Sequence, residues 1–322
     1  DRMLAALRSA FRRHGASPLS SRAVTWASET FESDRDADNA GARVLGESSR
    51  DAHVLLSRSG ALITLRRDLR SSLVRQVTAE QATSLRASCV GVTFRGGGDN
   101  RVKTEGDGDD AGGKKTAASG GLPREHVQAD FDIIAPRDAV DAAVLDAETI
   151  KCMWDALAER GIAPRVVLGH RRLAAAAWSA SGVDSRLRPR VSAVLRRRGD
   201  APPTPAALRL EPSVAERVAE LHAVGAEESS TLAELHNAAQ KNVVSSTRVV
   251  RAAVDHLCSV SAHLEAMGVP ASQMRIAPLL PPPESYHCST YFEIAVARPK
   301  TKEETLIAAP HAVVAAGGRY DA

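Results

Sequence analysis

The stretch Gly317-Gly318-Arg319-Tyr320-Asp321-Ala322, which follows the apolar run at residues 313–316, decides how the rest of the chain is interpreted. Two adjacent glycines let the backbone approach another group closely, or turn where a Cβ atom would clash. We expect a buried strand to end here and to present Arg319 and Tyr320 at the floor of a ligand pocket. A plain turn is the alternative. We also expect the chain to be a fragment of a longer protein.

The composition is that of a globular protein with one large domain or two ordinary ones. Aromatic residues make up only 3% of the chain, so the core must consist mainly of Ala, Val and Leu. The net charge is only +3, but arginines gather in groups that suit an RNA backbone or a solvated helix face. These groups are Arg12-Arg13, Arg66-Arg67, Arg171-Arg172 and Arg196-Arg197-Arg198.

The four cysteines stand far apart and form no Cys-x-x-Cys pair, which argues against a zinc site and a disulfide framework. We expect reduced thiols in a cytoplasmic protein that holds no metal and no cofactor. No run of about 18 apolar residues occurs, and the first residues lack a signal-peptide pattern. The sequence therefore predicts no membrane partner. The cysteines are Cys89, Cys152, Cys258 and Cys288.

The first 95 residues alternate short helices and strands. Leu4, Leu7 and Phe11 recur on one face of an amphipathic helix. Asp68 lies near the start of a later helix, where a carboxylate caps the first turn or contacts a ligand. Residues 29–50 are polar and are expected to form a long, mobile loop. The expected elements are a helix at 3–13, strands at 22–26, 53–56 and 61–65, a helix from 66 to about 77, and a strand at 88–95.

The strand at 88–95 and the return strand that follows it form a hairpin interrupted by residues 96–121. The Gly, Asp and Lys content of this stretch predicts a disordered insertion. On the return strand Gln128, Asp130 and Asp132 alternate with apolar residues, so the three polar side chains share one face. We expect this face to line a cavity. A solvent-facing sheet surface is the alternative.

The remaining sequence predicts mainly helices up to residue 267 and strands after it. We therefore expect three segments: a first core part at 1–181, a helical insertion at 182–267 and a second core part at 268–322. The expected helices lie at 138–160, 171–180, 190–198, 213–222, 231–240 and 248–267, and the expected strands at 165–168, 274–279, 286–296 and 313–318.

The ordered motifs resemble the class II histidyl-tRNA synthetase core. That family has a Leu-Arg-Pro-Glu-x-Thr segment that contacts the amino acid, a Phe-Arg strand, a return strand with Gln and Glu, and Ala-Gly-Gly-Arg-Tyr-Asp. The resemblance implies an α+β fold with a class II aminoacyl-tRNA-synthetase-like antiparallel sheet flanked by helices, and a homodimer. The counterparts here are Leu65-Arg66-Arg67-Asp68, Phe94-Arg95, Gln128 with Asp132, and Ala316-Gly317-Gly318-Arg319-Tyr320-Asp321.

The chain departs from this family at the positions that activate the amino acid. Pro282-Pro283-Glu284-Ser285 stands where the family has Arg-Gly-Leu-Asp. Arg70 replaces the threonine and would place a positive charge in a pocket that must hold an ammonium group. The resemblance therefore implies a degenerate amino-acid and ATP pocket with no catalytic residues. The pocket positions are Asp68, Arg70, Arg95, Gln128, Asp132, Gly317, Gly318, Arg319 and Tyr320.

Other segments resemble the histidyl-tRNA-synthetase-like regulatory domain of the amino-acid-starvation kinase that phosphorylates the alpha subunit of eukaryotic initiation factor two. They are Phe11-Arg12-Arg13-His14-Gly15-Ala16, Asp68-Leu69-Arg70 with Arg75, and Pro123-Arg124-Glu125 running into Asp130-Phe131-Asp132-Ile133. The resemblance implies binding of uncharged tRNA and control of a linked serine/threonine kinase domain. The chain itself contains neither a His-Arg-Asp catalytic loop nor an Asp-Phe-Gly motif.

Three functions are open from the sequence. The first is a tRNA-binding pseudoenzyme that regulates the kinase domain of its parent chain. The second is an active histidyl-tRNA synthetase core, and the third is an amino-acid-binding regulatory paralogue of it. For the first, tRNA affinity would come mainly from arginine contacts to phosphates. The candidate arginines are Arg66, Arg67, Arg124, Arg171, Arg172, Arg196, Arg197 and Arg198.

Overall fold

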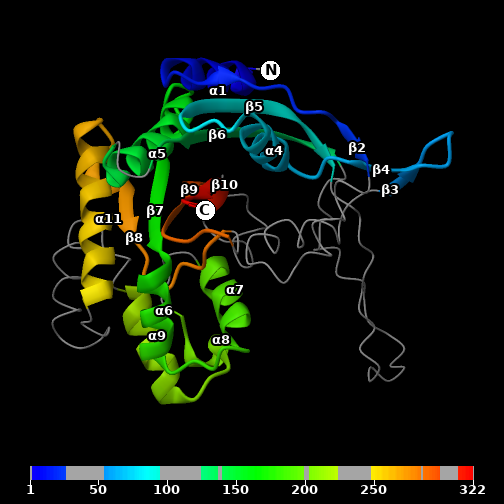
Figure 1. Cartoon of the computed structure of the whole chain (residues 1–322). Helices are drawn as coiled ribbons and strands as arrows, with labels where there is room; N and C mark the ends of the chain where they lie inside the picture. Colours follow the sequence, from blue (N-terminus) through cyan, green and yellow to red (C-terminus); the bar gives the residue numbers. More distant parts are fainter. Residues whose placement is uncertain are drawn as a thin grey trace. The chain divides into compact units, whose positions relative to one another are not determined.

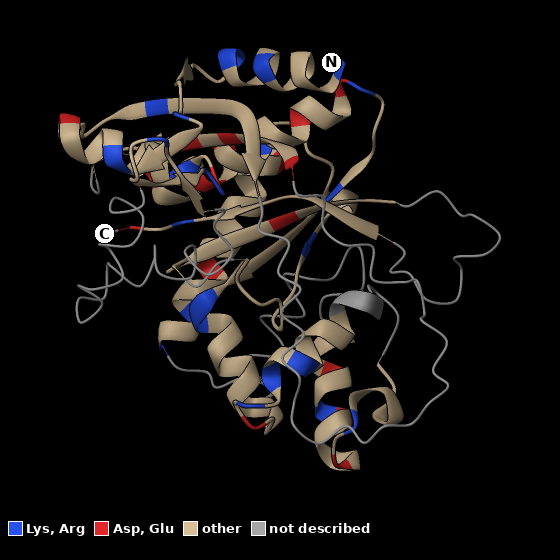
Figure 2. Ribbon diagram, turned by 90° about the vertical axis from the view of Figure 1, so that its right-hand side faces the viewer, with Lys and Arg blue, Asp and Glu red and all other residues tan. Residues whose placement is uncertain are grey.

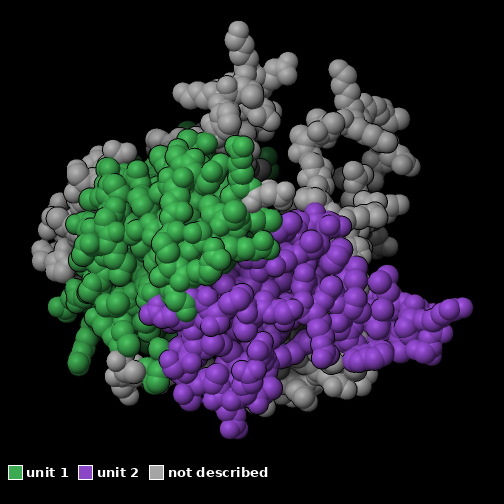
Figure 3. All heavy atoms as spheres, turned by 90° about the horizontal axis from the view of Figure 1, so that it is seen from above, with its two compact units in different colours: residues 1–15, 135–322 green, residues 16–134 purple. Residues whose placement is uncertain are grey.

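The computed structural model describes residues 2–26, 54–94, 125–136, 140–198, 203–223, 248–283, 286–297 and 311–321, with side chains left out at 196–198. These residues fall into two compact units (Figure 3). Unit 2 comprises residues 16–134, and unit 1 comprises residues 1–15 and 135–322.

Unit 2 is built on a long antiparallel pair of strands covered by one helix (Figure 1). The register places Gly91 opposite Gln128 and Cys89 opposite Asp130. A separate three-stranded antiparallel sheet has the order β2-β4-β3. The elements are β1 (Ser17–Pro18), β2 (Val24–Trp26), β3 (Val54–Leu56), β4 (Leu62–Leu65), α4 (Arg70–Glu80), β5 (Leu85–Phe94) and β6 (Glu125–Ile134).

Unit 1 contains a four-stranded sheet with the order β10-β9-β7-β8, in which the β7–β8 pair alone is parallel. Its helices and strands are α1 (Arg2–Arg13), α5 (Ala142–Ala158), β7 (Pro164–His170), α6 (Arg171–Ser181), α7 (Arg188–Arg198), α8 (Pro205–Leu208), α9 (Pro212–Ala223), α11 (Arg248–Ala266), η1 (Ala271–Gln273), β8 (Met274–Ile276), β9 (Thr290–Ala297) and β10 (His311–Gly318).

The core of unit 1 is aliphatic, as the low aromatic content predicts. Leu168 of β7, Leu257 of α11 and Ile150 of α5 are fully buried in one cluster that also includes residues of α6, α9, β8 and β9. Burial of such side chains contributes about 1.5–3 kcal/mol each. One aliphatic core therefore holds the helices of unit 1 on its sheet.

The predicted α+β class and most of the predicted elements are confirmed. The helix expected from residue 66 begins at Arg70 instead. The backbone of Arg66 explains the delay, because its N–H donates to Ala23 and its carbonyl accepts from the N–H of Phe94. These strand-like bonds prevent residue 66 from joining the helix.

The expectation of a buried final strand is wrong for two residues. Val313 is 53% exposed and Val314 is 49% exposed. In the described part of the chain β10 pairs with β9 alone, and a β-bulge interrupts the pairing between Val313 and Ala315. An irregular strand at the edge of its sheet leaves such side chains in solvent.

Several predicted features lie outside the described residues: the loop at 29–50, the insertion at 96–121 and the helix at 231–240. The units divide the chain after residues 15 and 134, whereas composition suggested divisions after 181 and 267. Within unit 1, α11 packs on α5 and α6. Helix α11 thus shares a core with helices that precede the predicted insertion.

Gly169 tests how tightly the sheet of unit 1 is packed. A Cβ atom at this position would overlap the ring of Tyr291, which is fully buried and donates its hydroxyl to the carbonyl of Leu280 at 2.5 Å. We expect Gly169→Ala to destabilise the chain by at least about 2 kcal/mol because the ring cannot move without losing this bond. Urea unfolding measures the change.

The matched control is a thermodynamic cycle with Tyr291→Leu, which removes the ring. The double variant should lose clearly less stability than the sum of the two single variants. Simple additivity would show that the ring is not what Gly169 accommodates.

Candidate functional site

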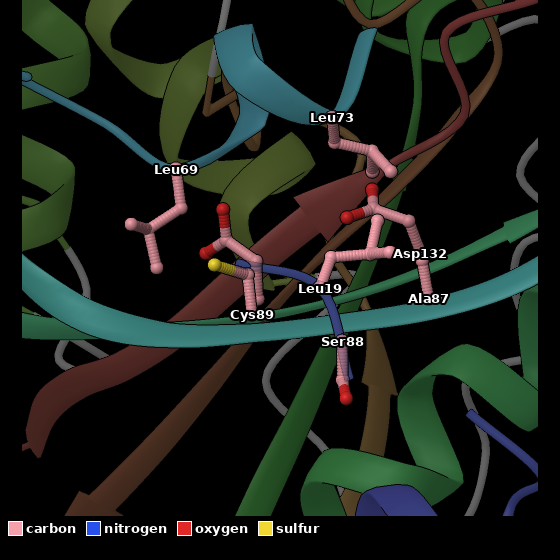
Figure 4. A pocket seen from close by; sticks show the side chains of 8 residues that line it. Leu19, Leu69, Leu73, Ala87, Ser88, Cys89 and Asp132 are labelled. Carbon is pink, nitrogen blue, oxygen red and sulfur yellow. The ribbon is translucent and has the colours of Figure 1, made fainter. Parts of the chain in front are cut away.

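Asp130 and Asp132, two of the three residues of the polar row predicted on β6, line a small pocket in unit 2 beneath α4 (Figure 4). The cavity measures about 10 Å³, which is about the space of one water molecule. Asp132 is only 8% exposed, so the solvent-facing alternative is excluded for this residue. The lining residues are Leu19, Leu69, Leu73, Ala87, Ser88, Cys89, Asp130 and Asp132.

The carboxyl group of Asp130 is strongly perturbed by its place in this pocket. Burial raises the pKa of Asp130 to about 6, and the charges of Asp132 and Asp68 act in the same direction. The amide of Gln128 opposes this shift, because its Nε2 donates to both carboxylate oxygens of Asp130 at 2.8 and 3.1 Å. The positive charge of Arg70 also opposes it. The side-chain amide of Gln128 is therefore hydrogen-bonded to Asp130, a neighbour on its own strand.

The segment that precedes α4 is also held by internal bonds. Asp68 accepts a hydrogen bond from the backbone N–H of Ser71 at 2.7 Å, which is the capping role that the sequence allowed. The guanidinium of Arg66 donates to the carbonyls of Val92 and Ser21. It also lies against Gly91, where a Cβ atom would sit 2.5 Å from Nη2. Arg66 thus ties the start of α4 to the sheet.

In unit 1 the two glycines of the opening motif face side chains of the same unit. A Cβ atom on Gly318 would lie 2.7 Å from the Cβ of Tyr291 and 2.9 Å from the ring of His287. A Cβ atom on Gly317 would lie 2.9 Å from the ring of Phe292. The close approach predicted for these glycines is therefore made by Tyr291 and Phe292 of β9 and by His287 of the segment before β9.

Arg319 is anchored beneath this segment by a buried carboxylate. Its Nη2 donates to Asp146 Oδ1 at 2.7 Å and to the carbonyl of Ala142 at 2.8 Å, both on α5. The other oxygen of Asp146 lies 2.9 Å from His256 Nε2 on α11. Only a tenth of the Asp146 side chain is exposed. One carboxylate thus joins the end of β10 to two helices.

His170 and Ser289 form a second polar pair near this anchor. His170 Nδ1 accepts the backbone N–H of Arg172 at 3.1 Å, so the neutral ring carries its proton on Nε2, 3.1 Å from Ser289 Oγ. Burial lowers the pKa of His170 to about 4, and the neighbouring His256 adds to the shift. In this tautomer His170 donates to Ser289 and cannot accept its proton, which excludes a serine nucleophile activated by this histidine.

The predicted tRNA-contacting arginines have different environments. The guanidinium of Arg66 donates to the carbonyls of Val92 and Ser21. Arg171 Nη1 donates to the carbonyl of His287 at 2.8 Å. Arg67 is half-buried and Arg172 is exposed. In the view of Figure 2 basic and acidic residues are interspersed along the helices. Arg95, Arg124 and the side chains of Arg196, Arg197 and Arg198 lie outside what the structure describes.

The structure brings Asp68, Arg70, Gln128 and Asp132 into unit 2, and Gly317, Gly318, Arg319 and Tyr320 into unit 1. Tyr320 packs edge-to-face on Tyr286, with ring centres 6.0 Å apart. Sequence reasoning missed Asp146 and His256 as partners of Arg319. They are 110 residues apart, and no local pattern indicates that α5 and α11 place them together.

In the structure all four cysteines are free thiols. Over the described ranges, no group of three or more His, Cys, Asp and Glu side chains is placed to hold a metal ion. Within the same ranges, no helix combines the length and the apolar character needed to cross a membrane.

The family pattern described as histidyl-tRNA synthetase matches residues 115–322. The fold resembles a histidyl-tRNA synthetase from Nostoc sp. PCC 7120, with a TM-score of 0.68 and 16% identity over 99% of this chain and 64% of that one. It also resembles an ATP phosphoribosyltransferase regulatory subunit/histidyl-tRNA synthetase from Bacillus halodurans C. There the TM-score is 0.65 and the identity 18%, over 99% of this chain and 71% of that one. No curated protein matches the sequence.

Asp130 should make the stability of unit 2 depend on pH. Its pKa is raised in the folded state, so its contribution is fully present below about pH 4 and is lost as the pH rises through about 6. We expect Asp130→Asn, which keeps an oxygen for Gln128, to stabilise the chain by about 1–3 kcal/mol at pH 7.5. At pH 4 the two proteins should unfold at the same urea concentration.

The control is Glu220→Gln on α9, which removes an exposed carboxylate from unit 1. It should leave the difference between pH 4 and pH 7.5 as it is in the unchanged protein. An equal stabilisation by Asp130→Asn at both pH values would contradict the assignment.

The Asp146 anchor predicts a large loss on truncation. We expect Asp146→Ala to destabilise the chain by about 3 kcal/mol, because it leaves Arg319 without its buried counter-ion. Asp146→Asn keeps one acceptor and should cost less. Chemical denaturation measures both, and equal, small losses for the two variants would show that the charge is unimportant.

Proposed function

Because the chain belongs to the histidyl-tRNA synthetase family, we propose that it is a catalytically degenerate member that binds uncharged tRNA and regulates a linked serine/threonine kinase domain. The kinase would phosphorylate the alpha subunit of eukaryotic initiation factor two during amino-acid starvation. Its family membership is shown by the matched pattern. The regulatory role, the tRNA and the linked kinase domain are inferred from segments such as Asp68-Leu69-Arg70 and Asp130-Phe131-Asp132-Ile133, which resemble the starvation-kinase family.

The observation that carries the proposed loss of activity is that the pocket side chains bind one another. Gln128 donates to Asp130, Asp68 caps α4, and the remaining cavity of about 10 Å³ has room for about one water molecule. A side chain that already bonds within the protein must break that bond before it can bind a ligand. Amino-acid binding in this part of unit 2 would therefore require the pocket to rearrange.

The sequence departures support the same reading. Pro282-Pro283-Glu284-Ser285 offers no arginine where the family activates its amino acid, and Arg70 brings a positive charge to the position of a threonine. Catalysis loses its advantage when the reacting groups are displaced by about 1 Å. A protein with these changes can keep the surface that binds tRNA after it has lost adenylation.

The chain would bind tRNA mainly through the phosphates. It would do so as a homodimer if the family's usual assembly is kept. Arg172 is a stronger candidate than Arg66 or Arg171, because the guanidiniums of those two residues already bind backbone carbonyls. Phosphate contacts of this kind weaken as salt rises, because binding releases condensed counter-ions.

The test is binding of uncharged and aminoacylated tRNA by the full chain at several salt concentrations. We expect tighter binding of the uncharged form and a steep fall of affinity with salt. Arg172→Ala should weaken binding and reduce the slope of log affinity against log salt by about one.

The matched control is Arg58→Ala, which removes an exposed arginine from the turn between β3 and β4. This variant should bind tRNA like the unchanged chain. Equal affinity for both tRNA forms at every salt concentration would contradict a role in sensing uncharged tRNA.

A further inference from the structure

Helix α1 of unit 1 is basic along its whole length. Its sequence, Arg-Met-Leu-Ala-Ala-Leu-Arg-Ser-Ala-Phe-Arg-Arg, contains four arginines and no acidic residue. Figure 2 shows blue segments on this helix, which lies beside the N label. Arg2, Arg8 and Arg12 are all exposed. The sequence left two interpretations for such a group, an RNA-binding face and a solvated helix face.

The apolar side of α1 is used for packing within unit 1. Ala10 and Phe11 are 0% and 1% exposed, and Met3 packs against the aliphatic core. The helix lies on α5. Among residues 2–13, no large apolar side chain is exposed. The outer face of α1 therefore offers positive charge without the apolar surface that an interfacial helix inserts into a membrane.

The acidic residues of α5 that lie beside α1 already have partners. Glu148 and Asp155 lie 3.6 and 3.3 Å from the two ring nitrogens of His14, which directly follows α1. Glu159, which follows α5, forms an ion pair with Arg13. These carboxylates hold the end of α1 on α5 and leave the charges of the outer face unbalanced.

Arg2, Arg8 and Arg12 have no such partner. Within the ranges that the structure describes, their side chains form no ion pair and no hydrogen bond. Their guanidinium groups are therefore available to a molecule that binds from outside.

Helix stability accounts for only part of this pattern. Arg12 lies in the last turn, where the helix dipole favours positive charge, but Arg2 lies in the first turn, where the dipole disfavours it. Arg8 and Arg12 are four residues apart, and like charges at this spacing repel each other. A face that served solubility alone would gain stability from acidic residues here. The unbalanced charge thus points to an anionic partner.

The spacing of these arginines suits a backbone that repeats its charges. Arg8 and Arg12 lie one turn apart, with about 5–6 Å between Cβ atoms. Arg2 and Arg12 are separated by about 15 Å along the axis, at about 1.5 Å per residue. Guanidinium groups bind phosphate oxygens through paired N–H donors. A nucleic-acid strand carries one phosphate per nucleotide, so it can contact several arginines of one helix at once.

We propose that the outer face of α1, formed by Arg2, Arg8 and Arg12, is a contact surface for the phosphate backbone of RNA. This inference deepens the proposed binding of tRNA and rests on it. The two can fail separately. Sensing requires a difference in affinity between uncharged and aminoacylated tRNA, whereas loss of phosphate contacts on α1 weakens the binding of both forms equally.

The experiment is tRNA binding by the full chain that carries Arg8→Gln and Arg12→Gln, at several salt concentrations. We expect the slope of log affinity against log salt to fall by about two, because two phosphate contacts are lost. Between about 50 and 200 mM salt, the affinity of the double variant should therefore fall about tenfold less than that of the unchanged chain.

Two matched variants separate this surface from bulk charge. Arg8→Lys with Arg12→Lys keeps both positive charges and should keep the slope. Arg248→Gln with Arg251→Gln removes two exposed arginines from the first turn of α11 and should bind like the unchanged chain. All variants should keep the melting temperature of the unchanged chain. Arg2→Gln with Arg8→Gln serves as the second variant should the first not fold.

An unchanged slope in the folded double variant would overturn the proposal, even if the chain prefers uncharged tRNA. An equal effect of the α11 variant would overturn it too, because any two arginines would then serve. Vesicles that contain phosphatidylserine test the other anionic surface, and their loss of binding in the double variant with tRNA binding unchanged would assign the face to a membrane. Equal affinity for both tRNA forms together with a reduced slope would support this surface and contradict the sensing role.

Discussion

The constraint on which the pocket of unit 2 depends is the burial of Asp130. A carboxyl group in an apolar site must be protonated, hydrogen-bonded or paired with a positive charge, because isolated burial of its charge costs several kcal/mol. Here Gln128 gives two hydrogen bonds, Arg70 gives positive charge, and burial raises the pKa to about 6. These interactions use the same side chains that a ligand would need. A ligand would therefore have to replace the internal bonds that stabilise the unit.

At the glycine-rich end of unit 1, too, side chains of the protein occupy the space that a ligand would need. Gly317 and Gly318 lack side chains, and the space beside them is taken by Phe292, Tyr291 and His287. Asp146 holds Arg319 from below and also contacts His256, so the segment is fixed from two helices. A motif that suggests a ligand floor can therefore be preserved because it packs well, whether or not a ligand binds.

Local patterns predicted most of the fold because they depend on neighbours in the sequence. The alternation of Gln128, Asp130 and Asp132 with apolar residues predicted the strand and its polar face. Patterns could not show that α4 covers the polar face, since this depends on packing between residues about 60 positions apart. Local patterns could not predict the contact between Asp146 and His256 either, because the two residues are far apart in the sequence. The exposure of Val313 depends on the place of β10 at the edge of its sheet. The polar face of β6 could thus be predicted from the sequence, whereas the hydrogen bonds between its side chains could not.

Histidine-dependent exchange of pyrophosphate into ATP measures whether the pocket still activates an amino acid. The full chain would be assayed beside an active histidyl-tRNA synthetase under identical conditions. We expect no exchange above the level without histidine, over a range of pH that includes the pKa of Asp130, about 6. Exchange that rises with histidine concentration would contradict it and would mean that the internal bonds of Gln128 and Asp68 open in the presence of the substrates.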